Sequence, residues 1–335
     1  MEKYIQKLLS SDNLSISEAS SAMDIIMDGK AENAQIAQFL LALKQKRETS
    51  DEVAGCVQSM RSHSKKIKLH DDFAVDGCGT GGDGSDSFNI STAAALVASS
   101  AGVTVAKHGN RSVSSKCGSS DLLEQAGVNL DLENKTVEKI INDIGFGFMF
   151  APKFHPAMKY AAPVRKELGE RTVFNILGPM TNPASVIRQL IGVYDKSLMH
   201  LMIEVLQKTG SVHVITAHSH DGMDEFSISS PTDYLELKDG RITEYTISPE
   251  DVGLKQMYTD ALIGGDAKFN HTILQSVLEG ETSAYLDAVC FNAGVLIYLA
   301  QKSENIKEGV RFAFEAVLAK KAKEKLYQYV EVSKQ

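Results

Sequence analysis

The sequence predicts an α/β protein in which a small N-terminal all-helical domain precedes a larger α/β domain with a central mixed, mainly parallel sheet flanked by helices. Two observations support this prediction: the first 65 or so residues show only helical periodicity, and from Phe73 onward short apolar runs alternate with helical patterns. The length of 335 residues agrees with it, because about 150 residues per domain gives two domains.

The N-terminal part contains capping signals for its helices. Ser15 and Glu18 have capping-box spacing, Thr49 and Glu52 repeat it, and Gly29 lies where the first of these helices would end. Between them, apolar residues recur at helical spacing: Ile36, Phe39, Leu40 and Leu43. The pattern predicts three or four short helices. Their apolar faces are too many for so small a unit to bury alone, so we expect packing on the rest of the chain or on a second subunit.

The remainder of the chain carries the signals of a covered sheet. Short apolar runs predict five strands, at residues 73–76, 103–106, 146–150, 190–194 and 212–217. A hairpin follows within residues 234–247, where Asp239-Gly240 is a favoured two-residue turn. After Asn270 the pattern is helical again. Ligand sites in such a fold are expected just beyond the strand ends.

Composition excludes several classes of protein. A chain with 43% hydrophobic and 23% charged residues is an ordinary globular protein, which argues against disorder, collagen and membrane proteins. The formal charge of −8 disfavours nucleic acid, because the longest basic run, 320–325, is interrupted by Ala322 and Glu324. No apolar run approaches the roughly 18 residues of a membrane span. Four scattered cysteines and the lack of a signal-peptide pattern predict a cytoplasmic protein.

A glycine-rich segment follows the first predicted strand. Residues 73–92 run through five glycines within eight residues to helix signals at 89–92. Glycine lets backbone amides turn inward and approach a ligand closely, so this loop can cradle phosphate; a tight turn without a ligand is the alternative. The glycines also match G-x-G-x-x-G, which raises a dinucleotide site. That interpretation is disfavoured because the second strand ends in Lys107-His108 and not in an acidic residue.

A second donor-rich segment, residues 107–121, follows the second predicted strand. Lys107, Arg111 and Lys116 supply positive charge, while Asn110 and five serines supply neutral donors. Such a mixture suits an anion with many oxygens, although a plain polar loop is the alternative. Because the two loops follow neighbouring strands, they should face one crevice. We therefore expect a ligand with phosphates at both ends, or a phosphorylated sugar.

An acidic pair follows the strand predicted at 212–217. Asp224 and Glu225 are hard oxygen ligands suited to Mg²⁺, which otherwise takes water and substrate phosphate. His218 and His220 with Asp221 imitate a zinc site, but position 222 is glycine and the usual H-x-H-x-D order fails. Magnesium is therefore favoured over zinc, and the absence of any metal is the remaining alternative.

Several longer motifs carry a resemblance to a known family. The sequence resembles the anthranilate phosphoribosyltransferases of tryptophan biosynthesis over essentially the whole chain. The first and third of the matching segments are shared with pyrimidine nucleoside phosphorylases, whereas the segment 163–183 and the length are more discriminating. The matching segments are GTGGDG (79–84), NIST (89–92), KHGNRSVSS (107–115), HPAM (155–158), PVRKELGERTVFNILGPMTNP (163–183) and the pair at 224–225.

The resemblance implies a reaction and a set of site residues. It implies transfer of 5-phosphoribose from 5-phosphoribosyl 1-pyrophosphate (PRPP) to the amine of anthranilate, with release of pyrophosphate and with Mg²⁺, two ions per subunit, as cofactor. Family contacts to PRPP fall on Gly79, Gly82, Asp83, Ser87, Asn89, Ile90, Ser91, Thr92, Lys107, His108, Gly109, Asn110, Arg111, Ser112, Val113, Ser114, Ser115 and Ser119. Anthranilate would meet Gly79, Asn110 and Arg165. Magnesium would be held by Ser91, Asp224 and Glu225.

The expected chemistry assigns catalytic roles to Lys107, Asn110 and Arg165. Lys107 stabilises departing pyrophosphate, and Arg165 can meet the anthranilate carboxylate with two parallel hydrogen bonds, unless it forms a surface salt bridge with Glu167 or Glu170. His108 orients substrate or caps its loop. His155 is expected to be structural.

The family resemblance also implies domain limits and an oligomer. The helical domain would comprise 1–69, with 165–185 returning to it, and the α/β domain 70–164 and 186–335. A homodimer through the helical domain is expected, with neither nucleic acid nor membrane as a partner. The alternatives are a pyrimidine nucleoside phosphorylase, a non-catalytic nucleic-acid-binding relative and a dehydrogenase. Cys78 and Cys117, beside the motifs, suggest thiol sensitivity.

Overall fold

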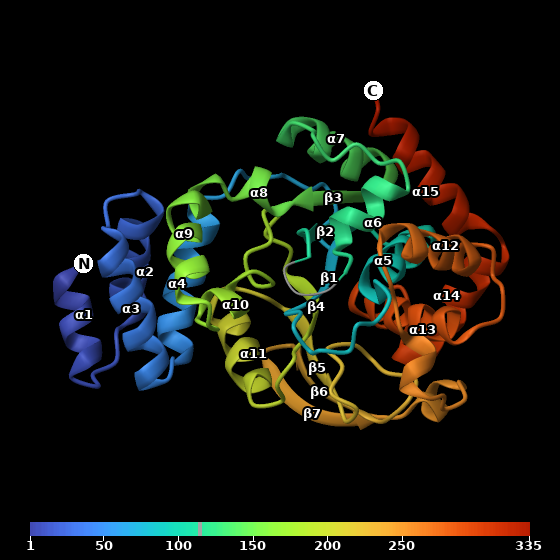
Figure 1. Ribbon diagram of the computed structural model, residues 1–335. Helices are drawn as coiled ribbons and strands as arrows, with labels where there is room; N and C mark the ends of the chain where they lie inside the picture. Colours follow the sequence, from blue (N-terminus) through green and yellow to red (C-terminus); the bar gives the residue numbers. More distant parts are fainter. Residues whose placement is uncertain (113–115) are drawn as a thin grey trace.

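The computed structural model describes residues 1–112 and 116–335. A helical module lies on one side of a central sheet and a group of C-terminal helices lies on the other (Figure 1). The predicted fold class is confirmed: an N-terminal helical part is joined to an α/β part with a mixed, mainly parallel sheet. Across the described ranges, no helix is long and apolar enough to cross a membrane.

The helical module begins with four helices, and both predicted capping boxes are present. The Ser15 amide donates to the Glu18 carboxylate at 2.8 Å, and the Thr49 amide donates to the Glu52 carboxylate at 2.8 Å. In return, the side chains of Ser15 and Thr49 accept from the amides of Glu18 and Glu52. These bonds pair amides that the start of a helix would otherwise leave without a partner. The helices are α1 (Glu2–Leu9), α2 (Ile16–Met27), α3 (Asn33–Lys46) and α4 (Ser50–Ser62).

Seven strands form one sheet in the order β3-β2-β1-β4-β5-β6-β7. Strands β1 to β5 pair in parallel, and β6 and β7 are antiparallel additions at one edge. The predicted hairpin turn is confirmed, with φ of 51° at Asp239 and 75° at Gly240, as a two-residue turn of this type requires. The strands are β1 (Val75–Gly79), β2 (Val105–Gly109), β3 (Phe146–Phe150), β4 (Arg188–Gly192), β5 (His213–Ser219), β6 (Thr232–Lys238) and β7 (Arg241–Ile247).

The first two strands extend further than their apolar runs predict. Strand β1 continues through Gly79, because 77–79 pair with 190–192 of β4. Strand β2 continues through Gly109 against β3, so Lys107 and His108 lie within the strand, beyond the apolar run 103–106 that predicted it. Polar residues and glycine end an apolar pattern without ending a ladder of backbone hydrogen bonds.

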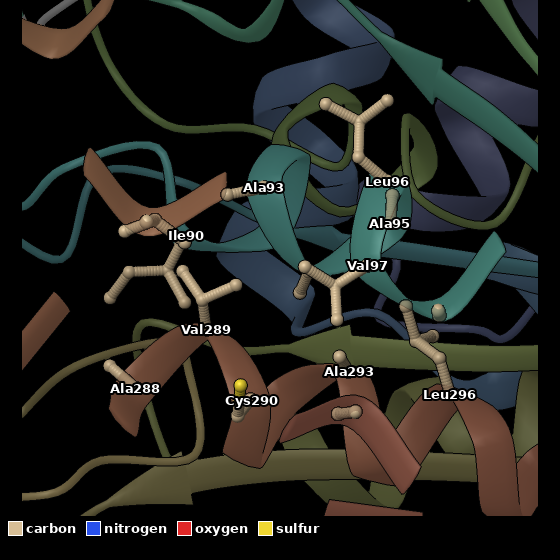
Figure 2. Packing of buried hydrophobic residues seen from close by; sticks show 14 of the residues in the cluster. Ile90, Ala93, Ala95, Leu96, Val97, Ala288, Val289, Cys290, Ala293 and Leu296 are labelled. Atoms are coloured by element: carbon tan, nitrogen blue, oxygen red, sulfur yellow. The ribbon is translucent and has the colours of Figure 1, made fainter. Parts of the chain in front are cut away.

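The main core lies between the sheet and the helices of the α/β part. Helix α5 packs on α13, and the buried side chains of Ile90 and Val97 point from α5 toward α13 (Figure 2). The remaining helices are α6 (Ser119–Gln125), α7 (Asn134–Ile144), α8 (Ala151–Phe154), α9 (Ala162–Leu168), α10 (Phe174–Leu177), α11 (Leu198–Lys208), α12 (Ala267–Leu278), α14 (Ile306–Leu318) and α15 (Lys321–Val332), with α5 at Ile90–Ser100 and α13 at Ala284–Leu299; short 3-10 helices are η1 (Pro156–Tyr160), η2 (Pro249–Val252) and η3 (Thr259–Leu262).

A second core joins the helical module to the rest of the chain. It combines the apolar faces of α1 to α4 with α9, α10 and α11 and with one face of the sheet around Ile191 and Val214. Ala161 and Val164 already belong to this core, so the returning segment begins to pack before residue 165. The four N-terminal helices thus bury their apolar faces on the rest of the chain, one of the two outcomes expected from the sequence.

Candidate active site

The three motifs of interest meet at one edge of the sheet. They follow β1, β2 and β5, and these strands run parallel, so their carboxyl ends lie at the same edge. Hydrogen bonds join all three: the Gly81 amide donates to Asp224 Oδ2 at 2.8 Å, and Asn89 Nδ2 donates to the carbonyl oxygen of Cys117 at 2.9 Å. The glycine loop is therefore in contact with both the acidic pair and the second donor-rich loop.

Two glycines let the acidic pair approach the strand ends. A Cβ at Gly79 would lie 2.2 Å from Asp224 Oδ2, and a Cβ at Gly192 would lie 1.5 Å from the carbonyl oxygen of Asp224. No other residue fits at either position without moving Asp224. Gly192, at the end of β4, was missed by the sequence analysis. Its signal is a glycine inside an apolar run, which marks a close approach of backbone.

Three carboxylates crowd this point. Burial, and next the charge of Asp83, raise the pKa of Asp224 to about 7; burial, and next Asp224, hold the pKa of Glu225 well above its usual range. The Ser91 amide donates to Glu225 Oε1 at 3.2 Å. Such a cluster of hard oxygen donors suits a small divalent cation, which would offset the mutual repulsion.

The acidic pair does not by itself form a complete metal cage. Within 1–112 and 116–335, no three His, Cys, Asp or Glu side chains are arranged to hold a metal ion. This fits Mg²⁺, which takes one or two protein carboxylates and fills its other positions with water and substrate phosphate. The zinc-like histidines are occupied elsewhere: His218 Nδ1 lies 2.8 Å from the Val193 carbonyl oxygen, and His220 Nε2 lies 2.9 Å from Asp233 Oδ2.

Lys107 is buried beneath this cluster, with 1% of its surface exposed. Its Nζ donates to the Gly77 carbonyl oxygen at 2.6 Å and to Ser91 Oγ at 3.4 Å. A buried cation needs opposite charge nearby, and its field lowers the pKa values of both Asp76 and Glu225 against the larger effect of burial. The ammonium group thus lies between the glycine strand and the first turn of α5.

Asp76 and Asn182 form a buried pair that sequence analysis missed. Asn182 Nδ2 donates to Asp76 Oδ2 at 2.7 Å and to the Ala106 carbonyl oxygen at 2.9 Å, while the His108 amide donates to Asp76 Oδ1 at 3.2 Å. Burial raises the pKa of Asp76 to about 6. The only signal was an acid ending the apolar run 73–76. The pair ties β1 and β2 to the end of the returning segment.

The first turn of α5 presents a mixed set of predicted site residues. The side chains of Ile90 and Thr92 are buried in the core, whereas the side chains of Ser91 and Asn89 contact Lys107 and the Cys117 carbonyl oxygen of the second loop. Asn89 Oδ1 also accepts from Asn270 Nδ2 at 2.9 Å. Ile90 and Thr92 can therefore contribute backbone, but their side chains serve the fold.

The glycine loop turns back toward α5 beyond Gly82. Gly81 and Gly82 have φ of 67° and 77°, in the left-handed region that favours glycine. Asp83 Oδ1 accepts from the Ser85 amide at 3.2 Å, and Ser87 forms a bridge with Ile263. The loop is thus fixed at both ends, while Gly82 itself is exposed.

The second loop is less basic than its sequence suggests. Arg111 is exposed and pairs with Asp121 at 2.8 Å and with Glu124 at 2.6 Å, so two carboxylates of α6 offset its charge. Ser119 Oγ donates to the Asn110 carbonyl oxygen at 3.1 Å. A Cβ at Gly109 would lie 2.4 Å from that hydroxyl. The Ser112 amide donates to Asp121 Oδ2 at 3.3 Å. The predicted contacts Val113, Ser114 and Ser115 lie outside the described residues.

His108 and His155 form a buried ring pair, with centroids 5.0 Å apart. Burial lowers the pKa of His155 to about 4, and burial with the neighbouring ring holds the pKa of His108 well below its usual range. Both rings are therefore neutral at pH 7. The Nε2 atom of each is buried without a hydrogen-bond partner among the described residues.

Arg165 stands on α9 with its guanidinium carbon 5.2 Å from the centroid of the Phe174 ring. Burial lowers the pKa of its guanidinium. The alternative of a surface salt bridge is wrong: Glu170 pairs instead with Lys44, and among the described residues no carboxylate pairs with Arg165. A half-buried cation without an anion is suited to a ligand carboxylate.

Comparison with known proteins gives a consistent family assignment. Residues 2–64 match the model "Glycosyl transferase family, helical bundle domain" and residues 71–323 match "Glycosyl transferase family, a/b domain". Anthranilate phosphoribosyltransferase of Clostridium kluyveri is 45% identical over 322 residues, covering 96% of each chain, and that of Methanococcoides burtonii is 48% identical over 332 residues, covering 99% of this chain and 94% of the other.

Solved structures agree with these relatives. The anthranilate phosphoribosyltransferase of Thermus thermophilus has a TM-score of 0.95 at 39% identity, with 99% of each chain covered. The enzyme of Saccharomyces cerevisiae in complex with PRPP and Mg has a TM-score of 0.90 at 28% identity, covering 99% of this chain and 97% of that one. The yeast enzyme has also been solved in complex with 4-fluoroanthranilate.

Proposed function

The chain belongs to the anthranilate phosphoribosyltransferase family, and from this premise we propose how its crevice carries out the reaction. The protein transfers the 5-phosphoribosyl group of PRPP to the amine of anthranilate, which gives N-(5-phosphoribosyl)anthranilate and pyrophosphate, a step of tryptophan biosynthesis. The observation that supports this most directly is the acidic pair held against a glycine-rich strand end by the Gly81 amide. None of the described crevice residues specifically favours a nucleoside phosphorylase, a dehydrogenase or a nucleic-acid-binding protein.

The donor is proposed to lie along the glycine loop and the start of α5. Backbone amides at Gly79, Gly82 and Asp83 would meet phosphate oxygens, since the glycines let the backbone come close. Ser87, Asn89 and Ser91 add polar groups beside them. The second loop would cover the other end of PRPP through the remaining residues predicted to contact it: Lys107, His108, Gly109, Asn110, Arg111, Ser112, Val113, Ser114, Ser115 and Ser119.

Magnesium is proposed to bind at Ser91, Asp224 and Glu225, with two ions per subunit. When bound, Mg²⁺ stabilises negative charge on pyrophosphate oxygens. The protein prepares this site with two amides: that of Gly81 orients Asp224, and that of Ser91 orients Glu225. The buried ammonium of Lys107 keeps Glu225 closer to its ionised form and adds positive potential where the leaving group departs.

Anthranilate is proposed to bind with its carboxylate on Arg165. The guanidinium has no competing carboxylate among the described residues, and a planar fork can make two parallel hydrogen bonds to one carboxylate. Asn110 and Gly79 would complete the acceptor site near the donor. In this arrangement Arg165 fixes the carboxylate of anthranilate, and the adjacent amine then points toward C1 of the ribose.

The reaction needs no protein nucleophile. The amine nitrogen forms a bond to C1 of the ribose while the C1–O bond to pyrophosphate breaks. The electron pair of the broken bond leaves with the pyrophosphate oxygen, and the nitrogen releases one proton to water. The aromatic amine is already neutral at pH 7, so it does not have to be deprotonated before it attacks. Correct placement of the two substrates can lower the activation free energy by on the order of 7 kcal/mol in favourable models. The side chains of the crevice accordingly bind and orient; they do not form covalent intermediates.

The protein is also proposed to work in the cytoplasm. Its helical domain would comprise residues 1–69 with 165–185, and its catalytic domain residues 70–164 and 186–335. Two copies would pair through their helical domains to form a homodimer. In support, Leu9 on α1 and Leu41 on α3 are 58% and 37% exposed, which leaves apolar surface on this module. Light scattering of the parent and of Leu41→Asp would test the pairing.

The activity is tested by the fluorescence of anthranilate. Consumption should require both PRPP and Mg²⁺ and should stop when either is omitted. Release of uracil or thymine on addition of inorganic phosphate would instead favour a nucleoside phosphorylase. Submicromolar DNA binding at physiological salt without transferase activity would favour a non-catalytic relative.

A further inference from the structure

Arg171 connects the returning segment to the glycine loop. Its Nη2 donates to the Gly82 carbonyl oxygen at 2.7 Å, and its guanidinium carbon lies 3.7 Å from the centroid of the Tyr194 ring. Arg171 comes six residues after Arg165, beyond the end of α9, the helix that packs on α3. One side chain thus bridges the segment that carries Arg165 and the loop on which PRPP is proposed to lie.

Tyr194, on whose ring Arg171 stacks, is itself hydrogen-bonded to the glycine loop. The Tyr194 amide donates to Thr80 Oγ1 at 3.0 Å, and the Thr80 amide donates to the Gly192 carbonyl oxygen at 2.9 Å. Tyr194 therefore holds the loop at Thr80, while Arg171, stacked on the Tyr194 ring, holds it two residues later at Gly82. A planar guanidinium can stack and donate at once, which an ammonium cannot do.

The contact fixes the part of the loop that has most freedom. Gly81 and Gly82 both have positive φ. Glycine loses more conformational entropy than any other residue when its backbone becomes ordered. A hydrogen bond to the Gly82 carbonyl orients the following peptide, whose amide belongs to Asp83. Preordering this stretch lowers the entropy that PRPP binding would otherwise have to overcome.

We propose that Arg171 is a positioning residue which, stacked on Tyr194, fixes the Gly82 carbonyl and keeps the glycine loop in its PRPP-binding conformation. This inference rests on the proposed function, in which that loop binds PRPP. Arg171 need not touch either substrate. Its loss should weaken PRPP binding and leave the affinity for anthranilate unchanged.

The test is a calorimetric titration of PRPP in the presence of Mg²⁺ and without anthranilate. Arg171→Ala should raise the Kd for PRPP by about tenfold, which corresponds to about 1.4 kcal/mol, a magnitude expected for one hydrogen bond to a charged donor. Arg171→Lys keeps the charge but not the planar group, so it should recover little of the affinity. The KM for anthranilate should stay within about twofold of the parent in both variants. Lys166→Ala removes an exposed positive charge from α9 and is the matched control, expected to bind PRPP like the parent.

A double-mutant cycle separates positioning from simple charge attraction. Tyr194→Ala should weaken PRPP binding in the same direction, and combining it with Arg171→Ala should add little, because the two side chains act as one unit. Additive effects, or full affinity in Arg171→Lys, would overturn the proposal. If the parent itself binds no PRPP, the proposed function fails instead, so the two failures are distinguishable. Circular dichroism spectra that match the parent show that each variant is folded.

Discussion

Asn182 donates a hydrogen bond to Asp76 across 106 residues of sequence, at 2.7 Å and fully inside the protein. Together with the bond from Asn182 Nδ2 to the Ala106 carbonyl oxygen, it ties the end of the returning segment, residues 165–185, to strands β1 and β2. Because burial raises the pKa of Asp76 to about 6, the carboxyl is mainly ionised at pH 8 and depends on its donors.

Asn182→Ala is therefore expected to destabilise the protein. It leaves an oxygen of a buried carboxylate without its donor, which should lower the free energy of unfolding by about 2–3 kcal/mol at pH 8. At pH 5, where Asp76 is protonated, the loss should be smaller. Urea denaturation at both pH values checks this. Asn33→Ala, at an exposed position of α3, should change the unfolding free energy by no more than about 0.5 kcal/mol; equal losses at the two pH values would contradict the role of the charge.

Asp224→Asn and Glu225→Gln are expected to weaken the dependence on magnesium. Each substitution removes one of the two carboxylates of the proposed site. The apparent affinity for Mg²⁺ should fall by about 100-fold, because losing even a residue that only hydrogen-bonds to a metal ligand lowers metal affinity roughly 10–100-fold. Steady-state rates as a function of Mg²⁺ concentration measure this. Glu244→Gln, an exposed change on β7, serves as the control. A titration curve identical to the parent's would remove the pair from the metal site.

The fold could be predicted from the sequence wherever the spacing of apolar residues agrees with the capping and turn residues at the ends of an element. The capping boxes at Ser15 and Thr49 and the Asp239-Gly240 turn are local rules, and the structure satisfies each one. The ends of β1 and β2 could not be predicted so well. They are set by pairing with β4 and β3, which is a long-range interaction that no apolar run reports.

The candidate site shows the same division. The glycine loop and the acidic pair stand out because few other functions require such residues together. Gly192 and Asn182 do not, because each is needed only by a neighbour more than 30 residues away in sequence, respectively Asp224 and Asp76. Likewise the pairing of Arg111 with Glu124 depends on where α6 begins, and charge counting alone overstated the basic character of that loop.

The neutral state of the buried histidine pair predicts an acid-sensitive fold. Because burial lowers the pKa of His155 to about 4 from an ordinary value near 6.5, the unfolded chain binds the proton more readily than the folded chain. The contribution of His155 to stability should be complete above pH 6.5 and decrease as pH falls toward 4, by on the order of 3 kcal/mol.

Urea denaturation between pH 4 and pH 8 measures this dependence. His155→Gln should flatten the dependence of unfolding free energy on pH over that range, whatever its effect at pH 8. The exposed His70→Gln should leave the slope as in the parent. A slope that His155→Gln does not alter would assign the acid sensitivity to other groups.

Arg165 provides the sharpest test of acceptor binding, because anthranilate differs from aniline only by the carboxylate that Arg165 is proposed to hold. Arg165→Ala should raise the KM for anthranilate by about 10- to 100-fold, as expected for loss of a bidentate charged contact of roughly 1.5–3 kcal/mol, with little change in the KM for PRPP. Aniline has no carboxylate for Arg165 to hold. We therefore expect the parent to use aniline much less well than anthranilate, and Arg165→Ala to leave the rate with aniline unchanged. Steady-state kinetics with both amines, with Lys166→Ala as the control, measure this difference. If Arg165→Ala slows both amines equally, the guanidinium acts on a step common to them, and the carboxylate must be bound by another residue.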